Sequence, residues 1–319
     1  MSNLLAVRAE GLTKRYGALT AVDGISMSVA EGEVYGVLGP NGAGKTTFLR
    51  MLFGLIRPDA GTLEVFGRSW ARNGTASLEG VAGFLESPRF YPYLTGRRNL
   101  QLLAGLDGGG AARRIDEVLD VVDLAGRDGD KVGGYSFGMR QRLGVAAALL
   151  RDPRLLVLDE PANGLDPAGI RDMRALVHRL ASSGLTVLLS SHDMDEVEEI
   201  CDNVTIMKRG TVAYHGTITS LREQAPPQAH LLRTSDDVRA LALADGRDGL
   251  AVTTTDGQLA VRGTQEAVDA YVSALVRAGL AVRSLTLGEA PLEALFFMLT
   301  ESTPEEAPHD LATAMESRR

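Results

Sequence analysis

The chain of 319 residues is poor in cysteine and in aromatic side chains. Its one cysteine, Cys201, has no second cysteine in the chain to pair with, so an internal disulfide is excluded. Phe, Trp and Tyr make up only 5% of the residues, against 45% hydrophobic residues overall. We therefore expect a globular core built mainly of Ala, Val and Leu, with Cys201 buried in a protein kept in a reducing compartment.

Long hydrophobic runs and an excess of basic charge are also missing. The apolar stretch at residues 143–158 is interrupted by Arg151, Asp152 and Arg154, so it stays below the ~18 residues of a membrane-spanning helix. Within residues 1–17, charged residues occur too early for a signal peptide. The 33 basic and 41 acidic residues give a net charge of −8, which does not favour nucleic-acid binding. These features predict a cytoplasmic protein with no nucleic-acid partner.

The strongest signal that is present is a glycine-rich stretch that fits the pattern G-x-x-x-x-G-K-[ST]. It follows an apolar run at residues 33–38 and precedes a helix predicted for residues 45–53, whereas a mere linking turn would not need the lysine and hydroxyl in this order. Such a loop binds nucleotide phosphates with backbone N–H groups, and we expect Lys45 at the β- and γ-phosphates and Thr46 at Mg²⁺. The stretch comprises Gly39, Pro40, Asn41, Gly42, Ala43, Gly44, Lys45, Thr46 and Thr47.

A second apolar run, residues 155–158, ends in two carboxylates. Asp159 is placed at the end of the predicted strand, where we expect it to hold Mg²⁺ through water. Glu160 follows and is a candidate for the group that polarises the attacking water. Two solvated acids at the end of a strand are the structural alternative, but the phosphate-binding loop upstream favours catalysis.

The predicted elements divide into two domains. Alternating segments within residues 4–29 predict antiparallel strands, and apolar runs with helices between them predict a parallel, doubly covered sheet. Together they predict an α/β P-loop nucleotide-hydrolase cassette over residues 1–222, with a mixed sheet core, an antiparallel β subdomain and an α-helical subdomain at about residues 86–150. The parallel strands are expected at residues 33–38, 155–159 and 185–190, and the helices at residues 113–122, 140–150 and 171–183.

A linker is predicted at residues 223–229, which contain two prolines. Beyond it, residues 230–302 predict a small α+β domain with the order βαββαβ, a ferredoxin-like unit. Residues 303–319 are charged and predict a disordered tail. The expected strands are residues 230–234, 250–255, 259–262 and 280–287, with a turn at Asp256-Gly257; the expected helices are residues 236–245, 264–278 and 291–300.

The segment before the second apolar run resembles a block of the nucleotide-binding subunit of ATP-binding cassette (ABC) transporters. Ser136 is a good helix N-cap, and the helix is followed by the strand that ends in Asp-Glu-Pro. The resemblance implies that Ser136, Phe137, Gly138 and Met139 are the family's signature, which binds the γ-phosphate held by a second ATPase subunit, expected to be identical. Tyr135, Phe137 and Met139 replace the first, third and fifth residues of the usual Leu-Ser-Gly-Gly-Gln.

Three further stretches agree with this resemblance. They imply that His192 is the switch histidine at the γ-phosphate and that Tyr16 stacks on adenine, although a structural histidine and a surface-strand tyrosine are the alternatives. The D-loop, which the family uses at the subunit interface, corresponds to Asn163, Gly164, Leu165 and Asp166.

Glu86 stands where the family normally has a glutamine near the metal. A carboxylate there repels γ-phosphate unless it coordinates Mg²⁺, beside Thr46 and Asp159, or stays back from the site. A glutamate here resembles the branch that exports bacitracin, lantibiotics and anthracyclines. The aromatic residues that follow are candidates for contact with an integral-membrane permease, or they pack within the helical subdomain; they are Phe90, Tyr91 and Tyr93.

The resemblance thus predicts an ATPase that binds ATP and Mg²⁺, dimerises and powers a separately encoded permease at the inner face of the cell membrane. The branch implies export of a drug, antibiotic or antimicrobial peptide. A soluble cassette ATPase acting on ribosomes or nucleic acid is one alternative, but such proteins usually carry two cassettes and basic surfaces. A non-hydrolysing regulatory subunit, suggested by Glu86 and Met139, is another.

Overall fold

The computed structural model describes residues 4–106, 109–255 and 257–301. Its contacts divide the chain into two units, Met1–Ile218 and Thr219–Arg319. Helix α8 (Ile218–Gln224) spans the division and runs into the segment predicted as a linker. The predicted tail at residues 303–319 lies outside the described residues. None of the helices described is long and apolar enough to cross a membrane.

The first unit is built on a six-stranded sheet with the order β10-β9-β3-β8-β7-β6. All neighbouring pairs are parallel except β10 and β9. Every residue of β3, β7 and β8 is buried, which explains why their apolar runs show no alternation. The strands are β3 (Val34–Leu38), β6 (Val81–Phe84), β7 (Leu155–Asp159), β8 (Thr186–Ser191), β9 (Asn203–Lys208) and β10 (Thr211–Thr217).

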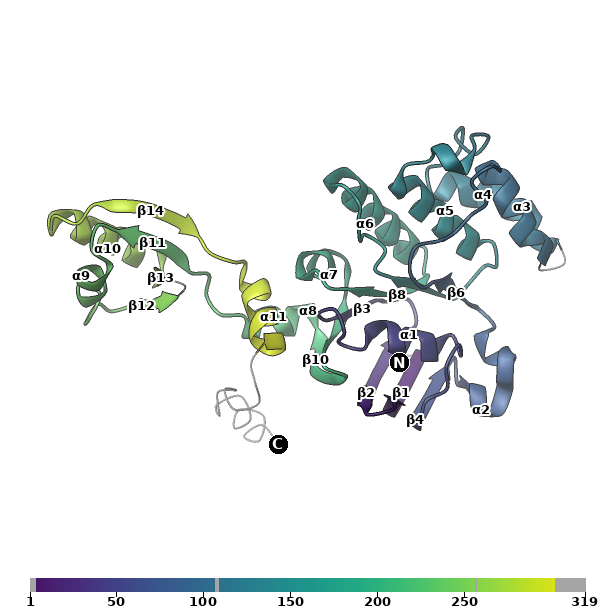
Figure 1. Ribbon diagram of the computed structural model, residues 1–319, viewed down its shortest axis with the longest axis horizontal. Helices are drawn as coiled ribbons and strands as arrows, with labels where there is room; N and C mark the ends of the chain where they lie inside the picture. The colour runs from purple at the N-terminus through teal and green to yellow at the C-terminus, as the bar shows by residue number, and fades with distance from the viewer. Residues whose placement is uncertain (1–3, 107–108, 256, 302–319) are drawn as a thin grey trace. The chain divides into compact units, whose positions relative to one another are not determined.

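A second, antiparallel sheet with the order β2-β1-β4-β5 lies below the first in Figure 1. Helix α1 (Lys45–Leu52) lies between the two sheets, and one hydrophobic core joins its Phe48 and Leu49 to both of them. The predicted antiparallel subdomain is therefore present, and it holds the helix that follows the phosphate-binding loop. Its strands are β1 (Leu5–Tyr16), β2 (Leu19–Ala30), β4 (Ala60–Val65) and β5 (Arg68–Ser69).

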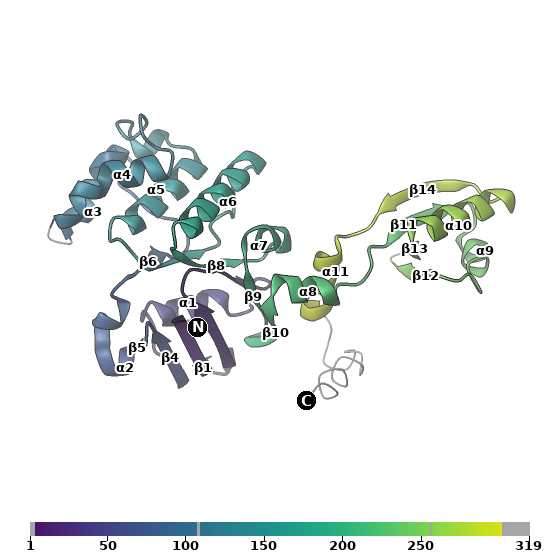
Figure 2. The same cartoon turned by 180° about the vertical axis from the view of Figure 1, so that it is seen from behind.

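Helices α5, α6 and α7 pack on the other face of the six-stranded sheet, and α3 and α4 pack against α5 (Figures 1 and 2). Helix α6 begins before the predicted residue 171, because the Asp166 carboxylate caps it by accepting from the Gly169 N–H at 2.9 Å. The helix predicted at residues 113–122 begins as a 3₁₀ turn (Gly110–Arg114). The helices are α3 (Gly96–Leu106), α4 (Ile115–Val121), α5 (Phe137–Leu149), α6 (Pro167–Ser182) and α7 (Met194–Ile200).

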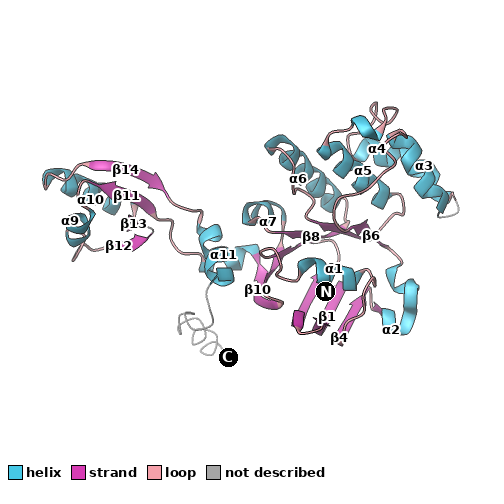
Figure 3. Cartoon of the chain, in the orientation of Figure 1, coloured by secondary structure: helices cyan, strands magenta, loops and turns pink. Residues whose placement is uncertain are grey.

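The second unit contains a four-stranded antiparallel sheet with the order β12-β13-β11-β14. Helices α9 and α10 pack on one of its faces around Leu232, Val261 and Tyr271 (Figure 3). The element order from β11 to β14 is the βαββαβ predicted from the sequence; residue 256 of the predicted turn lies outside the described residues. The elements are β11 (His230–Thr234), α9 (Asp237–Ala242), β12 (Leu250–Thr255), β13 (Gln258–Gly263), α10 (Gln265–Arg277), β14 (Val282–Leu287) and α11 (Pro291–Glu301).

Candidate functional site

The phosphate-binding loop connects the end of β3 to the start of α1. Its backbone tolerates only glycine at two points, since a Cβ on Gly39 would lie 2.5 Å from the Met207 carbonyl oxygen and one on Gly44 would lie 2.4 Å from that of Ala21. Gly44 also has φ = 105°, which side chains rarely adopt. Lys45 folds back over the loop, where its Nζ donates to the Gly39 carbonyl at 2.6 Å. The glycines of the pattern are therefore required by packing as well as by phosphate access.

Three strands end at this loop and bring the predicted catalytic residues together. Within the sheet, Leu38 of β3 pairs with Ser191 of β8, and Asp159 of β7 pairs with Ser190. The Thr46 hydroxyl donates to Asp159 Oδ2 at 3.1 Å, so the phosphate-binding loop and the second apolar strand are in contact. The carboxyl ends of parallel strands are where α/β folds place their ligand sites.

Glu160 links the lysine of the loop to the histidine of the next strand. Its Oε1 lies 3.1 Å from Lys45 Nζ, and its Oε2 lies 2.5 Å from His192 Nδ1. Lys45 is only 6% exposed, so its ammonium depends on the nearby carbonyl and carboxylate oxygens for compensation. An incoming γ-phosphate would therefore compete with Glu160 for Lys45.

Thr46 and Asp159 offer a hydroxyl and a carboxylate oxygen to a cation. This hard-oxygen pair fits Mg²⁺, which is commonly held by one or two protein groups together with substrate phosphates and water. Among the described residues there is no group of three or more His, Cys, Asp or Glu side chains able to hold a metal by themselves. The third predicted ligand, Glu86, instead forms an exposed ion pair with Arg50 Nη2 at 3.0 Å.

The predicted signature and D-loop line one hollow of about 390 Å³. Ser136 caps α5, accepting from the Met139 N–H at 3.2 Å, and Gly138 lies beside Leu165, whose Cδ2 would be in van der Waals contact with an added Cβ at 3.5 Å. Gly164 lies against the Phe137 ring in the same way. The structure thus places these two predicted segments side by side, and their role at an interface stays a prediction.

The predicted D-loop also contacts the backbone of Glu160, because the Asn163 N–H donates to the Glu160 carbonyl at 3.1 Å. Tyr16, by contrast, lies at the far end of β1 and is 46% exposed. Lys14 Nζ lies 5.6 Å from the centre of its ring. The ring is accessible, and its stacking on adenine remains a prediction.

Tyr91 and Tyr93 form an exposed aromatic pair, with ring centroids 5.7 Å apart. Buried Asn99 fixes the loop that carries them: its Oδ1 accepts from the Tyr91 N–H, and its Nδ2 donates to the carbonyls of Tyr91 and Thr95. Sequence reasoning missed Asn99, which follows Arg97 and Arg98 in the polar first turn of α3 and therefore carries no distinguishing signal. Phe90 lines a neighbouring groove with Phe84, Leu103, Leu106 and Gly144.

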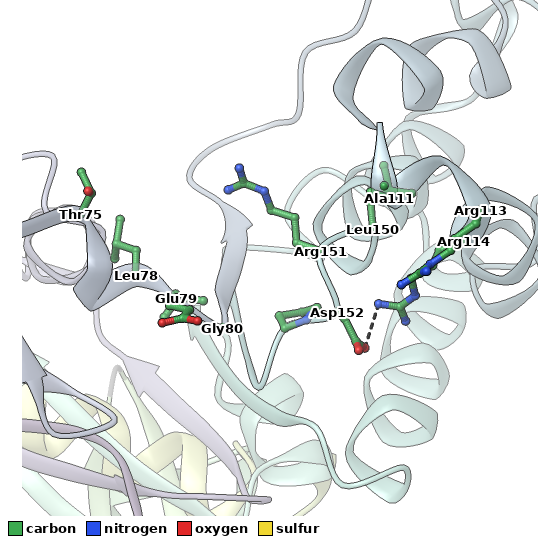
Figure 4. Close-up of a pocket in the computed structure, with 13 residues that line it drawn as sticks. Thr75, Leu78, Glu79, Gly80, Ala111, Arg113, Arg114, Leu150, Arg151 and Asp152 are labelled. Carbon is green, nitrogen blue, oxygen red and sulfur yellow. Dashed lines mark ion pairs between the residues drawn. The ribbon is translucent and has the colours of Figure 1, made fainter. Parts of the chain in front are cut away.

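A larger hollow of about 640 Å³ lies away from the phosphate-binding loop (Figure 4). Arg113, Arg114 and Arg151 surround it, and Arg114 Nη1 pairs with Asp152 Oδ1 at 2.8 Å. None of the predicted site residues lines this hollow. Its size therefore does not identify the nucleotide site, which is defined by chemistry at the strand ends.

Glu196, in the first turn of α7, is buried beneath the histidine loop at 4% exposure. Its Oε2 accepts from the Ser191 hydroxyl at 2.5 Å. Burial raises the pKa of Glu196 from 4.5 to about 7, despite the opposing effect of this hydrogen bond. The proton on Glu196 is consequently held more tightly in the folded protein than in the unfolded chain.

This difference predicts a pH-dependent gain in stability for Glu196→Gln. As pH rises from 4.5 to about 7, the unfolded chain loses this proton first, so wild-type stability falls through that window. The amide carries no charge, and we expect it to raise the free energy of unfolding by about 1–3 kcal/mol at pH 8 and hardly at all at pH 5. Urea unfolding at both pH values measures this. Glu199→Gln, on the same helix but exposed, is the control, and an equal gain at both pH values would refute the prediction.

The fold and the site define a class of protein. A phosphate-binding loop, two carboxylates and a histidine meet at the carboxyl edge of a largely parallel sheet, as in P-loop nucleoside-triphosphate hydrolases.

Known proteins narrow the class further. The family described as "ABC transporter" matches residues 22–163. The bacitracin transport ATP-binding protein BcrA of Bacillus licheniformis is 46% identical over 64% of this chain and 67% of that protein. The daunorubicin resistance ATP-binding protein DrrA3 of Streptomyces coeruleorubidus is 37% identical over 92% of this chain and 96% of that protein. The chain belongs to the family of ABC transporter ATP-binding proteins and is an ATPase.

Solved structures agree with the cassette architecture. The structure of cbiO1 from Clostridium perfringens, described as part of the ABC transporter complex cbiONQ, has a TM-score of 0.63 at 27% identity. The matched region covers 69% of this chain and 91% of the cbiO1 chain. The α/β P-loop fold predicted from the sequence is confirmed.

Proposed function

We propose that two copies of this chain bind MgATP between them and drive a separately encoded permease in the membrane. The observation that carries this proposal is the contact network of Lys45, Thr46, Asp159, Glu160 and His192 at one end of the sheet. Each of these side chains suits one part of ATP hydrolysis, and they come from three segments of the chain. Their convergence supports a hydrolysing subunit over a regulatory one.

The residues divide the work of hydrolysis among them. The loop N–H groups and Lys45 bind the β- and γ-phosphates, and Thr46 with Asp159 would hold Mg²⁺, which neutralises phosphate charge when bound. Glu160 orients the attacking water and accepts its proton, and His192 forms a hydrogen bond to the γ-phosphate. Rate enhancement comes mainly from positioning and from these fixed charges.

The proposed site is completed by a second copy. The N-terminus of α5, a helix of 13 residues, presents backbone N–H groups beside Ser136 and Gly138 in an open hollow. No residue of the chain's own phosphate-binding loop lines this hollow. A γ-phosphate held by the partner copy is the occupant we propose.

Export of a drug, antibiotic or antimicrobial peptide is the proposed task. It is supported by the names of the relatives, which refer to bacitracin transport and daunorubicin resistance. The subunit would then lie at the inner face of the cell membrane, held by its permease. Co-expression with its permease should raise the tolerance of sensitive bacteria to bacitracin or daunorubicin, and the chain alone should not. If co-expression of the subunit and its permease leaves tolerance to bacitracin and to daunorubicin unchanged, neither compound is the cargo.

The exposed aromatic pair is the proposed permease contact, together with Phe90 in the adjoining groove. We expect Tyr91→Ala combined with Tyr93→Ala to lower co-purification with the permease about tenfold or more, because exposed aromatic side chains contribute most at such interfaces. The subunit itself should unfold at an unchanged temperature, since both rings are more than half exposed. Val238→Ala, at another exposed apolar side chain, is the control. Undiminished co-purification would move the contact elsewhere.

A further inference from the structure

Ser190 contacts both acidic residues that follow the apolar run of β7, through the Asp159 carboxylate and the Glu160 backbone N–H, and sequence reasoning gave it no role. We propose that Ser190 is a positioning residue that sets the orientation of Asp159 and the backbone turn of Glu160. The inference rests on the proposed binding of MgATP at this site. In this proposal the neutral hydroxyl of Ser190 orients Asp159 and Glu160.

The strand register places Ser190 directly beside Asp159. The two residues are partners in the parallel pairing of β7 and β8, and Ser190 is 0% exposed. Its hydroxyl donates to Asp159 Oδ1, while the Thr46 hydroxyl donates to Oδ2. Because each carboxylate oxygen has its own donor, the Asp159 side chain is held against rotation, with Oδ2 toward the phosphate-binding loop.

The same hydroxyl also accepts a hydrogen bond from the backbone of Glu160. The Glu160 N–H lies 3.0 Å from Ser190 Oγ and 3.2 Å from the Ser190 carbonyl oxygen. Glu160 has φ = 50°, the left-handed region that residues other than glycine adopt infrequently. From this turn its carboxylate reaches Lys45 and His192. The hydroxyl therefore helps to stabilise an unfavourable backbone conformation, and the orientation of the Glu160 carboxylate depends on that conformation.

The neighbouring serine has different partners. Successive side chains of a strand point to opposite faces, and the Ser191 hydroxyl donates to Glu196 and accepts from the Asp193 N–H. Ser191 thus fixes the loop that follows β8, and Ser190 alone of the two contacts the acids. The two serines before His192 therefore stabilise different parts of the structure: Ser190 the acidic residues at the end of β7, and Ser191 the loop that follows β8.

Removing the Ser190 hydroxyl leaves Asp159 Oδ1 buried without its donor and takes one acceptor from the Glu160 N–H. Partners that orient a metal-binding group typically change metal affinity or activity by about 10- to 100-fold when lost. We expect Ser190→Ala to weaken metal binding in the nucleotide complex by that factor. Binding of the nucleotide without metal should change less than about twofold, because the phosphate-binding loop is untouched.

The experiment titrates Mn²⁺ into the full-length protein with a non-hydrolysable ATP analogue and follows free Mn²⁺ by electron paramagnetic resonance. Thr186→Val is the matched control, since it removes a buried hydroxyl at the opposite end of the same strand, where Thr186 accepts from the Gly32 N–H. Ser190→Thr retains a hydroxyl and should bind Mn²⁺ more tightly than Ser190→Ala. Wild-type Mn²⁺ affinity in Ser190→Ala, or an equal loss in Thr186→Val, would overturn the proposal.

A second measurement separates this inference from the proposed function. In a crystal structure of nucleotide-free Ser190→Ala, we expect the Asp159 carboxylate to be rotated or Glu160 to leave the left-handed region. Unmoved acids would refute the positioning role whatever the ATPase rate. If instead the acids move while wild-type protein binds Mn²⁺ and the nucleotide analogue but releases no phosphate from ATP, the hydrolytic function fails and the role of Ser190 stands.

Discussion

Glu160→Gln is expected to lower steady-state phosphate release by about 100- to 10,000-fold, the usual contribution of a general base. The amide cannot accept the proton of the attacking water, although it has the size and shape of the carboxylate. It also carries no charge to hold Lys45, whose Nζ lies 3.1 Å from Glu160 Oε1. ATP would then meet an ammonium with no carboxylate partner, so we expect binding to be retained or tightened as turnover is lost.

This combination distinguishes a catalytic role from a structural one. Lys45→Ala removes the charge that faces the phosphates, and both binding and turnover should fall. Glu199→Gln, an exposed acid paired with Arg174, is the control and should leave both unchanged. Phosphate release and nucleotide binding measured on the same preparations provide the test. A Glu160→Gln protein that hydrolyses ATP at the wild-type rate would show that another group activates the water.

The core of the site was predictable because its chemistry is encoded locally. The phosphate-binding loop needs a fixed order of glycine, lysine and threonine, and Asp159 and Glu160 directly follow an apolar run. Parallel strands end at one edge of a sheet, so the convergence of these segments follows from the α/β alternation. The amphipathic patterns of the second unit likewise predicted its element order.

The remaining contacts depend on side chains brought together by tertiary packing. Nothing local indicates that Lys45 meets Glu160, that Arg50 pairs with Glu86, or that Ser190 bonds to its neighbouring strand. Asn99 similarly acts through a loop that precedes its helix. The start of α6 was misplaced because Asp166 was assigned only to the D-loop, whereas it also caps the helix. A residue such as Asp166, which belongs to a motif and also caps a helix, is only partly described by the motif.

The second large effect is expected from a negative charge at the proposed phosphate-binding end of α5. Aspartate is as good an N-cap as serine, so Ser136→Asp should keep the helix and its hydrogen bond to Met139. Its charge would repel the γ-phosphate of a partner copy. We expect turnover to fall by about 100-fold or more, as when a stabilising donor is lost from a transition-state site. Nucleotide binding to the chain's own loop should persist, while ATP-dependent pairing of copies in sedimentation should disappear.

The chain supplies a matched control for this substitution. Thr264 caps α10 in the second unit through the Ala267 N–H, so Thr264→Asp makes the same type of change at a helix that has no part in the proposed site. It should leave turnover and pairing unchanged.

Mixing two inactive variants tests directly whether the site is shared. In a pair formed by Ser136→Asp and Lys45→Ala copies, one site combines an intact phosphate-binding loop with an intact α5 N-terminus, and the other site has neither. Such mixtures should therefore recover phosphate release that neither variant shows alone. If mixing restores nothing, or if a molecule that sediments as a single copy with bound ATP turns over at the full rate, each chain must complete its own site.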